Sequence, residues 1–567
     1  MLTLLIALSI LMRIGYMEIN AHPDLSDFFA PRSISLAQNG LFSMYAQPDN
    51  FNYPPFSLIL TGMLTSLWIS LGGSLTTATG AGFVAILKLV SVSAEVGIVA
   101  FSYLVLPPRT RIRWFVPMLL AIYPGLIATT AFWGQTDALF TLPLLIAFWL
   151  LQQDHPRWAW AVFALALLTK FQAVVAVPLL LVLTFRRYGW RTTLICLLLL
   201  GGIAALTLAP FVAVSGLSSV FVPFTAAVDQ FSAYTINALN VWYLANPNVW
   251  TMRPPLLFEY PPDTQILFAG LTAKLIGLSA LAAYVGGLLI LVWRRAEQRH
   301  EWLWLTASYF GFFLLPTQMH ERYLYPAAVA SLLAVAQDRR VWWVALPTFL
   351  AFSYNVIITT QAPFDWLGMN PLFLLGDVTV FMALLLIATF GALNVILLTE
   401  ANKRRLVEWV FPLLIVGLTL TVGLKVAIPT PLPAGVTPLR TTLADSFQLA
   451  GFRLTSDADV WKLDLYWRAY AFNNQDYQMF VHVLQNGEIV AQEDARPQGG
   501  NYPTWRWFHN DLIVTSHQLA ITADVSPDTI NVGLYDPTTF VRVAVWQDDQ
   551  AAPDNAVRVW INQTTAP

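Results

Sequence analysis

The stretch FFLLPTQMHERYLYPAAV, residues 312–329, places three ionisable residues between two apolar runs. Each run has the composition of a helix in a lipid bilayer, where a charged side chain is costly unless it faces a partner or a polar cavity. The three residues, His320, Glu321 and Arg322, are consecutive. Ionisable residues at the end of a span mark a candidate functional site. The stretch therefore predicts a membrane protein with a polar site at one interface.

The composition of the 567-residue chain agrees with this interpretation. Hydrophobic residues make up 57 % of the sequence, charged residues make up 11 %, and the mean hydropathy is +0.59. These values exclude an ordinary soluble domain. The net charge of −2 gives no indication of a nucleic-acid partner, and the single Cys196 cannot form a disulfide within the chain. We therefore expect a polytopic membrane protein.

Clusters of basic residues predict which loops face the cytoplasm. Of the 23 Lys and Arg residues before residue 430, 15 fall in six short loops. Short loops rich in Lys and Arg lie on the cytoplasmic side of a membrane. The six loops contain Arg109, Arg111 and Arg113; Arg157; Arg186, Arg187 and Arg191; Arg294, Arg295 and Arg299; Arg339 and Arg340; and Lys403, Arg404 and Arg405. The opposite, outer side then receives residues 20–81, 132–136, the turn at 170, 214–264 and 317–322.

The apolar runs between these loops predict about thirteen transmembrane helices, because about 20 apolar residues cross a bilayer. The first run, residues 1–20, lacks the basic start of a signal peptide, so we expect a retained span with a cytoplasmic N-terminus. The other spans are expected near 82–106, 114–131, 137–152, 158–169, 171–185, 193–213, 265–293, 302–316, 323–336, 341–360, 372–398 and 408–428. The run 56–73 is expected along the outer interface, because a crossing there would place the loop at 109–113 outside.

The composition changes at a Pro-rich linker, residues 429–440, which separates the expected transmembrane domain, 1–428, from residues 441–567. The last segment contains short alternating runs such as KLDLYWRAY and INVGLYD, which are typical of strands. Its Asn486-Gly487 pair is a strong hairpin signal. We therefore predict an all-α polytopic membrane protein with a C-terminal, extracytoplasmic, all-β sandwich domain. Its tryptophans, including Trp461, Trp467 and those of PTWRW at 503–507, are expected to pack its core rather than to stack on sugars.

Several polar residues fall in the expected outer loops. Asp24 and Asp27 follow the first span, and Gln135 and Asp137 lie where a later span begins. Lys170 and Gln172 lie at an outward turn, where a lysine either extends to the interface or binds a phosphate.

Metal binding is the rival use of these groups, since Asp27, Asp137, His320 and Glu321 are hard-cation ligands. Their spacing matches no closed site, so we expect no metal and no cofactor. The chain also contains no Gly-rich phosphate loop and no Ser-His-Asp signature.

The outer-loop residues resemble those of the GT-C superfamily of integral-membrane glycosyltransferases. The nearest likeness is to dolichyl-phosphate-glucose-dependent glucosyltransferases and to bacterial mannosyltransferase-like relatives. The family's segment D-aromatic-x-A-x-R, its YPP turn and its LYPGLI segment resemble Asp27 to Arg32, Tyr53-Pro54-Pro55 and IYPGLI at 122–127. Its K-Q, A-N-x-W and HEK elements resemble Lys170 and Gln172, then Ala238, Asn240 and Trp242, then His320-Glu321-Arg322. The likeness covers roughly residues 1–330.

The resemblance implies inverting transfer of a hexose, mannose or glucose, from a polyprenyl-phosphate sugar. The acceptor would be an envelope glycolipid, polysaccharide or protein on the outer face of a bacterial-type plasma membrane. Asp27 would be the catalytic base. Lys170, Gln172, His320 and Arg322 would bind the donor phosphate. Residues that bind or orient substrate would be Arg32, Tyr53, Gln135, Asp137, Asn240, Trp242 and Glu321.

Two other functions remain open. A transporter or flippase of lipid-linked sugars also needs polar groups among many spans, but it predicts charges near the middle of the bilayer. A non-catalytic assembly protein built around the sandwich would leave Asp27 without a role. The sugar, the acceptor and the oligomeric state are open as well.

Overall fold

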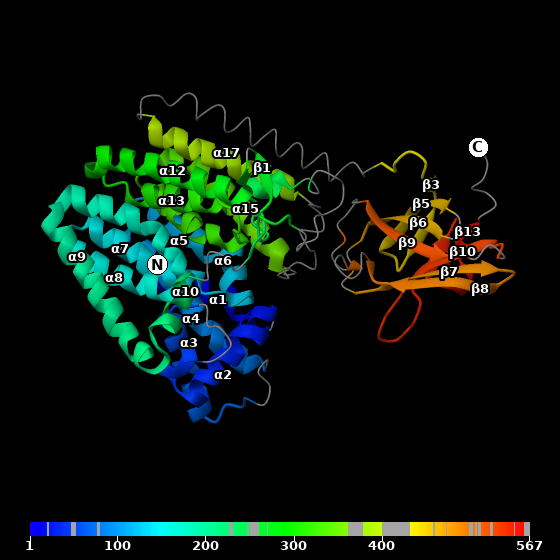
Figure 1. Cartoon of the computed structure of the whole chain (residues 1–567), viewed down its shortest axis with the longest axis horizontal. Helices are drawn as coiled ribbons and strands as arrows, with labels where there is room; N and C mark the ends of the chain where they lie inside the picture. The colour runs from blue at the N-terminus through cyan, green and yellow to red at the C-terminus, as the bar shows by residue number, and fades with distance from the viewer. Residues whose placement is uncertain are drawn as a thin grey trace. The chain divides into compact units, whose positions relative to one another are not determined.

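The computed structural model describes residues 1–19, 22–46, 53–75, 80–225, 231–246, 249, 260–268, 270–360, 378–399, 431–457, 460–471, 473, 475–497, 503–504, 507, 512–521, 525–548 and 550–560. The chain divides into two compact units. The first is helical, and the second consists mainly of the strands that follow residue 431 (Figure 1). The expected span 408–428 and the first two residues of the expected linker, 429 and 430, lie outside the described residues, as does the first part of the span 372–398.

The helical unit is built from many short and a few long helices. Its elements are α1 (Leu2–Ile14), η1 (Asp24–Phe29), α2 (Ala30–Asn39), η2 (Leu41–Ala46), α3 (Pro55–Ser70), α4 (Ala81–Val105), α5 (Ile112–Ala121), α6 (Pro124–Ile127), η3 (Ala128–Phe132), α7 (Asp137–Gln152), α8 (Pro156–Thr169), η4 (Phe171–Ala176), α9 (Val177–Ser215), α10 (Leu217–Thr225), α11 (Val241–Ala245), β1 (Ile266–Phe268), β2 (Leu271–Thr272), α12 (Ala273–Arg295), η7 (Ala296–Gln298), α13 (Glu301–Leu314), η8 (Glu321–Leu324), α14 (Tyr325–Ala334), η9 (Arg339–Val341), α15 (Trp342–Thr360) and α17 (Thr379–Leu398).

Five helical stretches among the described residues are long and apolar enough to cross a membrane. They are Ala81–Val105, Phe171–Ser215, Ala273–Gln298, Arg339–Thr360 and Thr379–Leu398. The bent pair α5 and α6–η3 makes a sixth if it counts as one span. Several expected spans form shorter helices, such as α13 with 14 residues and α14 with 10. The count of thirteen spans therefore stays a prediction, while the presence of several apolar helices of spanning length is confirmed.

Proline and glycine residues break the helices at defined places. The helical pair Ile112–Ala121 and Pro124–Phe132 bends by 43°, where Pro124 has no N–H to donate to the preceding turn. The long helix α9 contains a break at Gly189, whose φ of 78° and ψ of 174° are not helical. A third break lies at Lys170, between α8 and η4. These breaks interrupt apolar runs and so bring polar groups between them.

Four of the expected cytoplasmic basic loops contact one another or a neighbouring loop. Arg187 pairs with Glu301, and Arg299 pairs with Asp154 at 2.8 Å. The amide of Gln337 donates to the carbonyl oxygen of Arg299. These contacts join four segments: the loop after α7, the break within α9, the loop before α13 and the loop after α14. The described basic loops thus gather in one region, as their common charge predicts for one side of a membrane.

The C-terminal unit is made of two antiparallel sheets. One has the strand order β13-β10-β7-β8, and the other has the order β12-β11-β4-β5-β6-β9, with β3 paired to β5. The strands are β3 (Thr437–Pro438), β4 (Thr441–Leu443), β5 (Phe447–Asp457), β6 (Val460–Ala469), β7 (Gln478–Gln485), β8 (Glu488–Ala495), β9 (Ile513–Ala520), β10 (Thr529–Tyr535), β11 (Val545–Gln547), β12 (Gln550–Ala551) and β13 (Val557–Trp560). Apolar side chains from both sheets form one core, so the predicted all-β, sandwich-like region is confirmed.

Two details of this unit follow from its sequence. Asn486 and Gly487 connect β7 to β8 with φ angles of 54° and 87°, which is the backbone that the Asn-Gly pair favours in a hairpin. Trp467 and Trp507 are buried in the core beside Phe447, as expected for packing residues, and Trp461 packs against that core. Residues 505 and 506 of the PTWRW segment lie outside the described residues.

Candidate functional site

A cavity of about 290 Å³ lies in the helical unit, where segments far apart in the sequence meet. Its walls come from η1 and α2, from the residues after the break at Lys170, from the 214–264 region, from α12 and from the segment 316–323. Trp133 and Gln135 donate hydrogen bonds to Asp24, which lines the cavity. The sequence places η1, α2, Lys170, the 214–264 region and residues 317–322 in one set of outer loops, whereas α12 and the lining residues of 171–174 were predicted in spans. The structure brings that set together around one cavity.

Charged residues of both signs line the cavity. Among the described lining residues, Asp24 is the only carboxylate, and the basic residues are Arg32, Lys170, Lys274 and Arg322, together with His320. Tyr53, predicted to bind or orient substrate, and Gln172, predicted to bind the donor phosphate, also line it, and the remaining wall is largely apolar and aromatic. A single carboxylate therefore shares an enclosed space with several cations.

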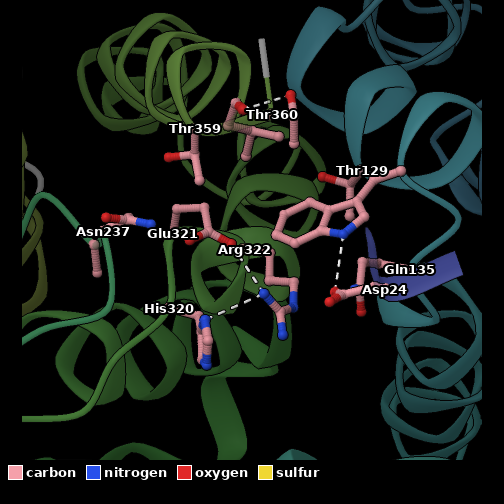
Figure 2. A network of polar contacts seen from close by, with 12 residues as sticks. Asp24, Thr129, Gln135, Asn237, His320, Glu321, Arg322, Thr359 and Thr360 are labelled. Carbon is pink, nitrogen blue, oxygen red and sulfur yellow. Dashed lines mark hydrogen bonds and ion pairs between the residues drawn. The ribbon is translucent and has the colours of Figure 1, made fainter. Parts of the chain in front are cut away.

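Asp24 is held by two donors from the α5–α7 connection. Its Oδ2 atom accepts hydrogen bonds from Nε1 of Trp133, at 3.0 Å, and from Nε2 of Gln135, at 2.7 Å. Figure 2 shows Gln135 directed toward Asp24, with a dashed contact from the indole. The other oxygen, Oδ1, lies 3.5 Å from Nδ1 of His22. Asp24 thus has one oxygen occupied by two fixed donors and one oxygen with fewer partners.

The electrostatic surroundings keep Asp24 ionised. Partial burial alone would raise the pKa of its carboxyl group, but the hydrogen bond to His22 and the positive charge of Arg322 outweigh burial. The pKa of Asp24 therefore lies below its usual value. A carboxylate at this position is a proton acceptor at neutral pH.

Asp27 occupies a different place from the one that the base assignment requires. Its side chain is exposed, accepts a hydrogen bond from Oγ of Ser26 at 2.7 Å and does not line the cavity. Both carboxylates belong to η1, a π-helix, in which hydrogen bonds join residues five apart. Three residues of separation place Asp24 and Asp27 on different faces. The first-loop carboxylate that lines the cavity is therefore Asp24, whereas Asp27, to which the family motif assigns the base, lies outside it.

Three ion pairs form the cationic wall. Nζ of Lys170 lies 2.8 Å from Oδ2 of Asp137, and Nε of Arg322 lies 3.9 Å from the same oxygen. Nη1 of Arg322 also donates to Glu321 Oε1 at 3.0 Å and lies 3.2 Å from Nδ1 of His320 (Figure 2). Asp137 and Glu321 do not line the cavity, so they support the cations from behind.

Burial and neighbouring charges set the protonation of the His-Glu-Arg group. Burial, reinforced by the charges of Arg322 and Lys170, lowers the pKa of His320 well below its usual value. Burial also raises the pKa of Glu321, and the charge of Arg322 opposes that rise. Burial alone would lower the pKa of Arg322, but Glu321 and other neighbours raise it further above its usual value. His320 is consequently neutral and Arg322 charged at neutral pH.

Aromatic rings complete the setting of the two cations. The guanidinium of Arg322 lies 4.7 Å from the ring centroid of Trp133, and Nζ of Lys170 lies 5.9 Å from that of Tyr323. Cations over aromatic faces are stabilised, most strongly where water is excluded. Trp133 therefore contacts both the carboxylate and a cation of the cavity wall. Its indole N–H donates to Asp24, and the guanidinium of Arg322 lies over its ring.

Asn240 and Trp242 have structural contacts and do not line the cavity. The side-chain oxygen of Asn240 caps α11 by accepting from the backbone N–H groups of Trp242 and Tyr243. Its amide donates to the carbonyl oxygens of Phe313 and Pro316, and Nε1 of Trp242 donates to that of Leu315 at 2.7 Å. Both residues thus satisfy carbonyl groups at the end of α13 and fix the backbone that leads to His320.

Residues that sequence reasoning missed also shape the cavity. Lys274 lines it from the first turn of α12, inside a run that the sequence predicted as a span. Asp263 is buried and accepts hydrogen bonds from Ser232, Thr317 and Gln318, which joins three segments of the outer region. A lysine within the predicted span 265–293 is itself a signal for a polar site. Asp263 has no comparable signal, because an isolated acidic residue in a loop is ordinarily solvated.

Within the described ranges, no group of three or more His, Cys, Asp or Glu side chains is arranged to hold a metal ion. Asp137, His320 and Glu321 are each placed in ion pairs or hydrogen bonds with cations instead.

No protein-family model matches the sequence, and no characterised protein resembles it at a significant level. The likeness to the GT-C superfamily therefore rests on the sequence motifs alone.

Proposed function

We propose that this chain is a membrane glycosyltransferase that moves a hexose from a polyprenyl-phosphate sugar to an acceptor hydroxyl with inversion at the anomeric carbon. The observation that carries the proposal is the pairing of Asp24 with the Lys170–Arg322–His320 wall in one cavity. A direct displacement needs a base for the incoming hydroxyl and cations for the departing phosphate. Few other reactions need both groups in a cavity among apolar helices.

Asp24 acts as the base in this scheme. The acceptor oxygen attacks the anomeric carbon and gives its proton to Oδ1 of Asp24, while Oδ2 remains bound to Trp133 and Gln135. The bond between the anomeric carbon and the phosphate oxygen breaks, and its electron pair leaves with the polyprenyl phosphate. Fixed donors on Oδ2 hold the carboxylate in one orientation, which is the geometric requirement for general base catalysis.

The cationic wall stabilises the leaving phosphate. Arg322 lines the cavity, and its Nε–H group is buried 3.9 Å from Oδ2 of Asp137 and has no hydrogen-bond partner among the described residues. Lys170 and Arg322 carry their charge to the cavity while Asp137 and Glu321 balance it from behind. A phosphate oxygen that enters the cavity meets charged donors that are already oriented, so little reorganisation accompanies departure of the leaving group.

The apolar part of the wall suits a lipid substrate. Leu278 and Leu281 of α12 line the cavity beside Phe312, and Leu278 is 42 % exposed on its helix. A polyprenyl chain can lie against such a surface while its phosphate reaches the cations. On this proposal the protein works on the outer face of a bacterial-type plasma membrane, with an envelope glycolipid, polysaccharide or protein as acceptor.

A transfer assay tests the proposed reaction. Purified protein in lipid is given radiolabelled polyprenyl-phosphate-mannose or polyprenyl-phosphate-glucose with an extract of envelope glycolipids, and a parallel sample contains EDTA. The proposal predicts transfer of label to acceptor, with the product in the opposite anomeric configuration. Failure to transfer either sugar, or retention of configuration, contradicts it, and loss of transfer in EDTA adds a metal to the scheme.

A flippase of lipid-linked sugars is the second candidate. It is favoured by charged residues inside the helices, because Arg13 of α1 and Glu95 of α4 form a buried pair. The same lipid vesicles distinguish the two functions. Movement of the labelled donor between leaflets without sugar transfer supports the flippase and rejects the transferase.

A further inference from the structure

A buried ion pair lies at the centre of the helical unit and is not part of the cavity wall. Arg13 and Glu95 are both fully buried, and their two contacts are Nε to Oε2 and Nη2 to Oε1, each 2.9 Å long. Ionisable residues in a transmembrane helix are costly and mark a functional element by default. Burying two charges among apolar helices costs desolvation free energy, and well-packed apolar residues at the same positions are often at least as stabilising. Stability alone therefore does not explain why this ion pair is present.

The arginine of this pair satisfies backbone groups where a helix breaks. Arg13 donates to the carbonyl oxygens of Leu120 and Ala121, at 3.4 and 2.8 Å, which are the last residues of α5. The usual donors four residues on are missing for both carbonyls, because Pro124 has no N–H group and the N–H of Gly125 binds Oγ of Ser353; Leu120 keeps a 3.5 Å bond from the N–H of Tyr123. Arg13 therefore caps the end of α5 inside the apolar region.

The glutamate of the pair binds the other side of the same break. The hydroxyl of Thr130, in the π-helix η3, donates to Oε2 of Glu95. Trp133 follows three residues later and Gln135 five residues later, and these are the two donors to Asp24. The ion pair thus contacts both sides of the bend between α5 and η3. Trp133 and Gln135, which donate to Asp24, follow this bend in the chain.

A second buried charge on α4 fixes the other approach to Asp24. Lys88 lies seven residues, or two helical turns, before Glu95, so both face the same way. Its Nζ donates to the carbonyl oxygens of Tyr16 and Ile19, at 3.0 and 2.7 Å, on the segment that leads from α1 to η1. One face of α4 therefore contacts both of the segments that meet at Asp24.

From these contacts we infer that Arg13 and Glu95 are positioning residues: they hold the α5–η3 bend so that Trp133 and Gln135 orient Asp24. The catalytic part of this inference rests on the proposed function, whereas the positioning of the segment does not. Neither residue touches the cavity, so each acts through η3.

Thr130→Val tests the link without leaving a buried charge unpaired. The substitution keeps the shape of the side chain but removes the hydroxyl that joins η3 to Glu95, while Arg13 and Glu95 stay paired. Thr129→Val is the matched control, because the hydroxyl of Thr129 donates to the carbonyl oxygen of Gly125 in the adjoining helix α6 and, among the described residues, makes no hydrogen bond to α4. Thr130→Ser restores the hydroxyl and is the rescue variant.

Two measurements are made on these variants. The first is kcat and KM for sugar transfer. The second needs no activity: in a Cys196→Ala background, Thr136→Cys places a thiol at a buried position beside Gln135, and its alkylation by a maleimide reports opening of the segment. For Thr130→Val we expect kcat to fall and alkylation to rise, each about tenfold, with KM unchanged, because a hydrogen bond to a charged group is lost. Thr129→Val and Thr130→Ser should match the parent.

The outcomes separate the two proposals. If Thr130→Val is alkylated at the rate of Thr129→Val, the bend is not held by Glu95 and the inference is overturned. If alkylation rises but kcat is unchanged in an active protein, the pair is only structural and the positioning role is rejected. If the parent transfers no sugar while alkylation changes as expected, the proposed function fails and the positioning of the Trp133–Gln135 segment stands.

Discussion

Replacement of Asp137 by Asn is expected to destabilise the protein strongly. The side chains of Asp137 and Lys170 are 1 % and 3 % exposed, and their charged atoms lie 2.8 Å apart. Arg322 lies 3.9 Å from the same carboxylate oxygen, so Asp137 balances two buried cations. Removing one partner of a buried ion pair typically costs about 3–5 kcal/mol, because the other charge is left uncompensated. With two cations affected, we expect a loss of about 4 kcal/mol in the free energy of unfolding.

A matched control lies on the other side of the helical unit. Asp154 pairs with Arg299 at the same distance of 2.8 Å, but their side chains are 55 % and 44 % exposed. Exposed pairs contribute about 0–1 kcal/mol, so Asp154→Asn should cost less than about 1 kcal/mol. The difference between the two variants isolates the effect of burial, since the chemical change is identical.

The free energy of unfolding is measured by reversible unfolding with denaturing detergent in mixed micelles, followed by circular dichroism. The double variant Asp137→Asn with Lys170→Met should recover part of the loss, because it removes the charge of Lys170 that Asp137→Asn leaves without its partner, while Arg322 keeps its pair with Glu321. Equal effects of Asp137→Asn and Asp154→Asn would refute the reasoning. So would a double variant that is less stable than Asp137→Asn alone.

Two further predictions concern pH and packing. The value of kcat/KM for transfer should show no titration near pH 6.5, because burial and neighbouring cations hold the pKa of His320 well below its usual value and the pKa of Asp24 lies below its own; a titration near pH 6.5 would contradict this. The lowered pKa of Asp24 also means that its ionised carboxylate stabilises the folded state above the unfolded pKa of 3.8, and this contribution is lost as pH falls through the folded pKa. Asp24→Asn should abolish this acid dependence of the midpoint of thermal unfolding. Gly134→Ala should lower the unfolding free energy by about 1–3 kcal/mol, because φ is +87° there and an added Cβ would lie 2.9 Å from Leu25. Gly287→Ala, which meets no atom within 4 Å, is the control, and equal midpoints of thermal unfolding for the two variants would contradict this packing argument.

The sequence predicted much of the grouping of segments. Basic loops contact one another, and all but one of the segments assigned to the opposite side meet at the cavity. This succeeds because the charge rule reports which loops share a side, whatever the lengths of the helices between them. The same rule does not report how apolar runs are divided: the predicted spans 302–316 and 323–336 correspond to the short helices α13 and α14, and whether these cross the membrane stays a prediction.

The roles of single residues were harder to predict. Asp24 and Asp27 are equivalent in the sequence, and only the π-helical turn of η1 decides which of them meets the cavity. Asn240 and Trp242 match a family motif, but their contacts are with carbonyl groups at the end of α13. Arg13 and Glu95 are 82 positions apart, and no local pattern connects them. Each of these cases depends on a long-range contact that composition and spacing do not contain.

The central claim is that Asp24 is the base of a sugar transfer. The most direct test compares Asp24→Asn with Asp27→Asn in the transfer assay, with donor binding measured for both. Loss of a general base reduces the rate by about 10²–10⁴-fold, so Asp24→Asn should bind the donor and transfer at least about a hundredfold more slowly. Asp27→Asn, at an exposed position three residues away, should transfer at the parent rate. Equal rates for Asp24→Asn and the parent, or loss of transfer only in Asp27→Asn, would contradict the account.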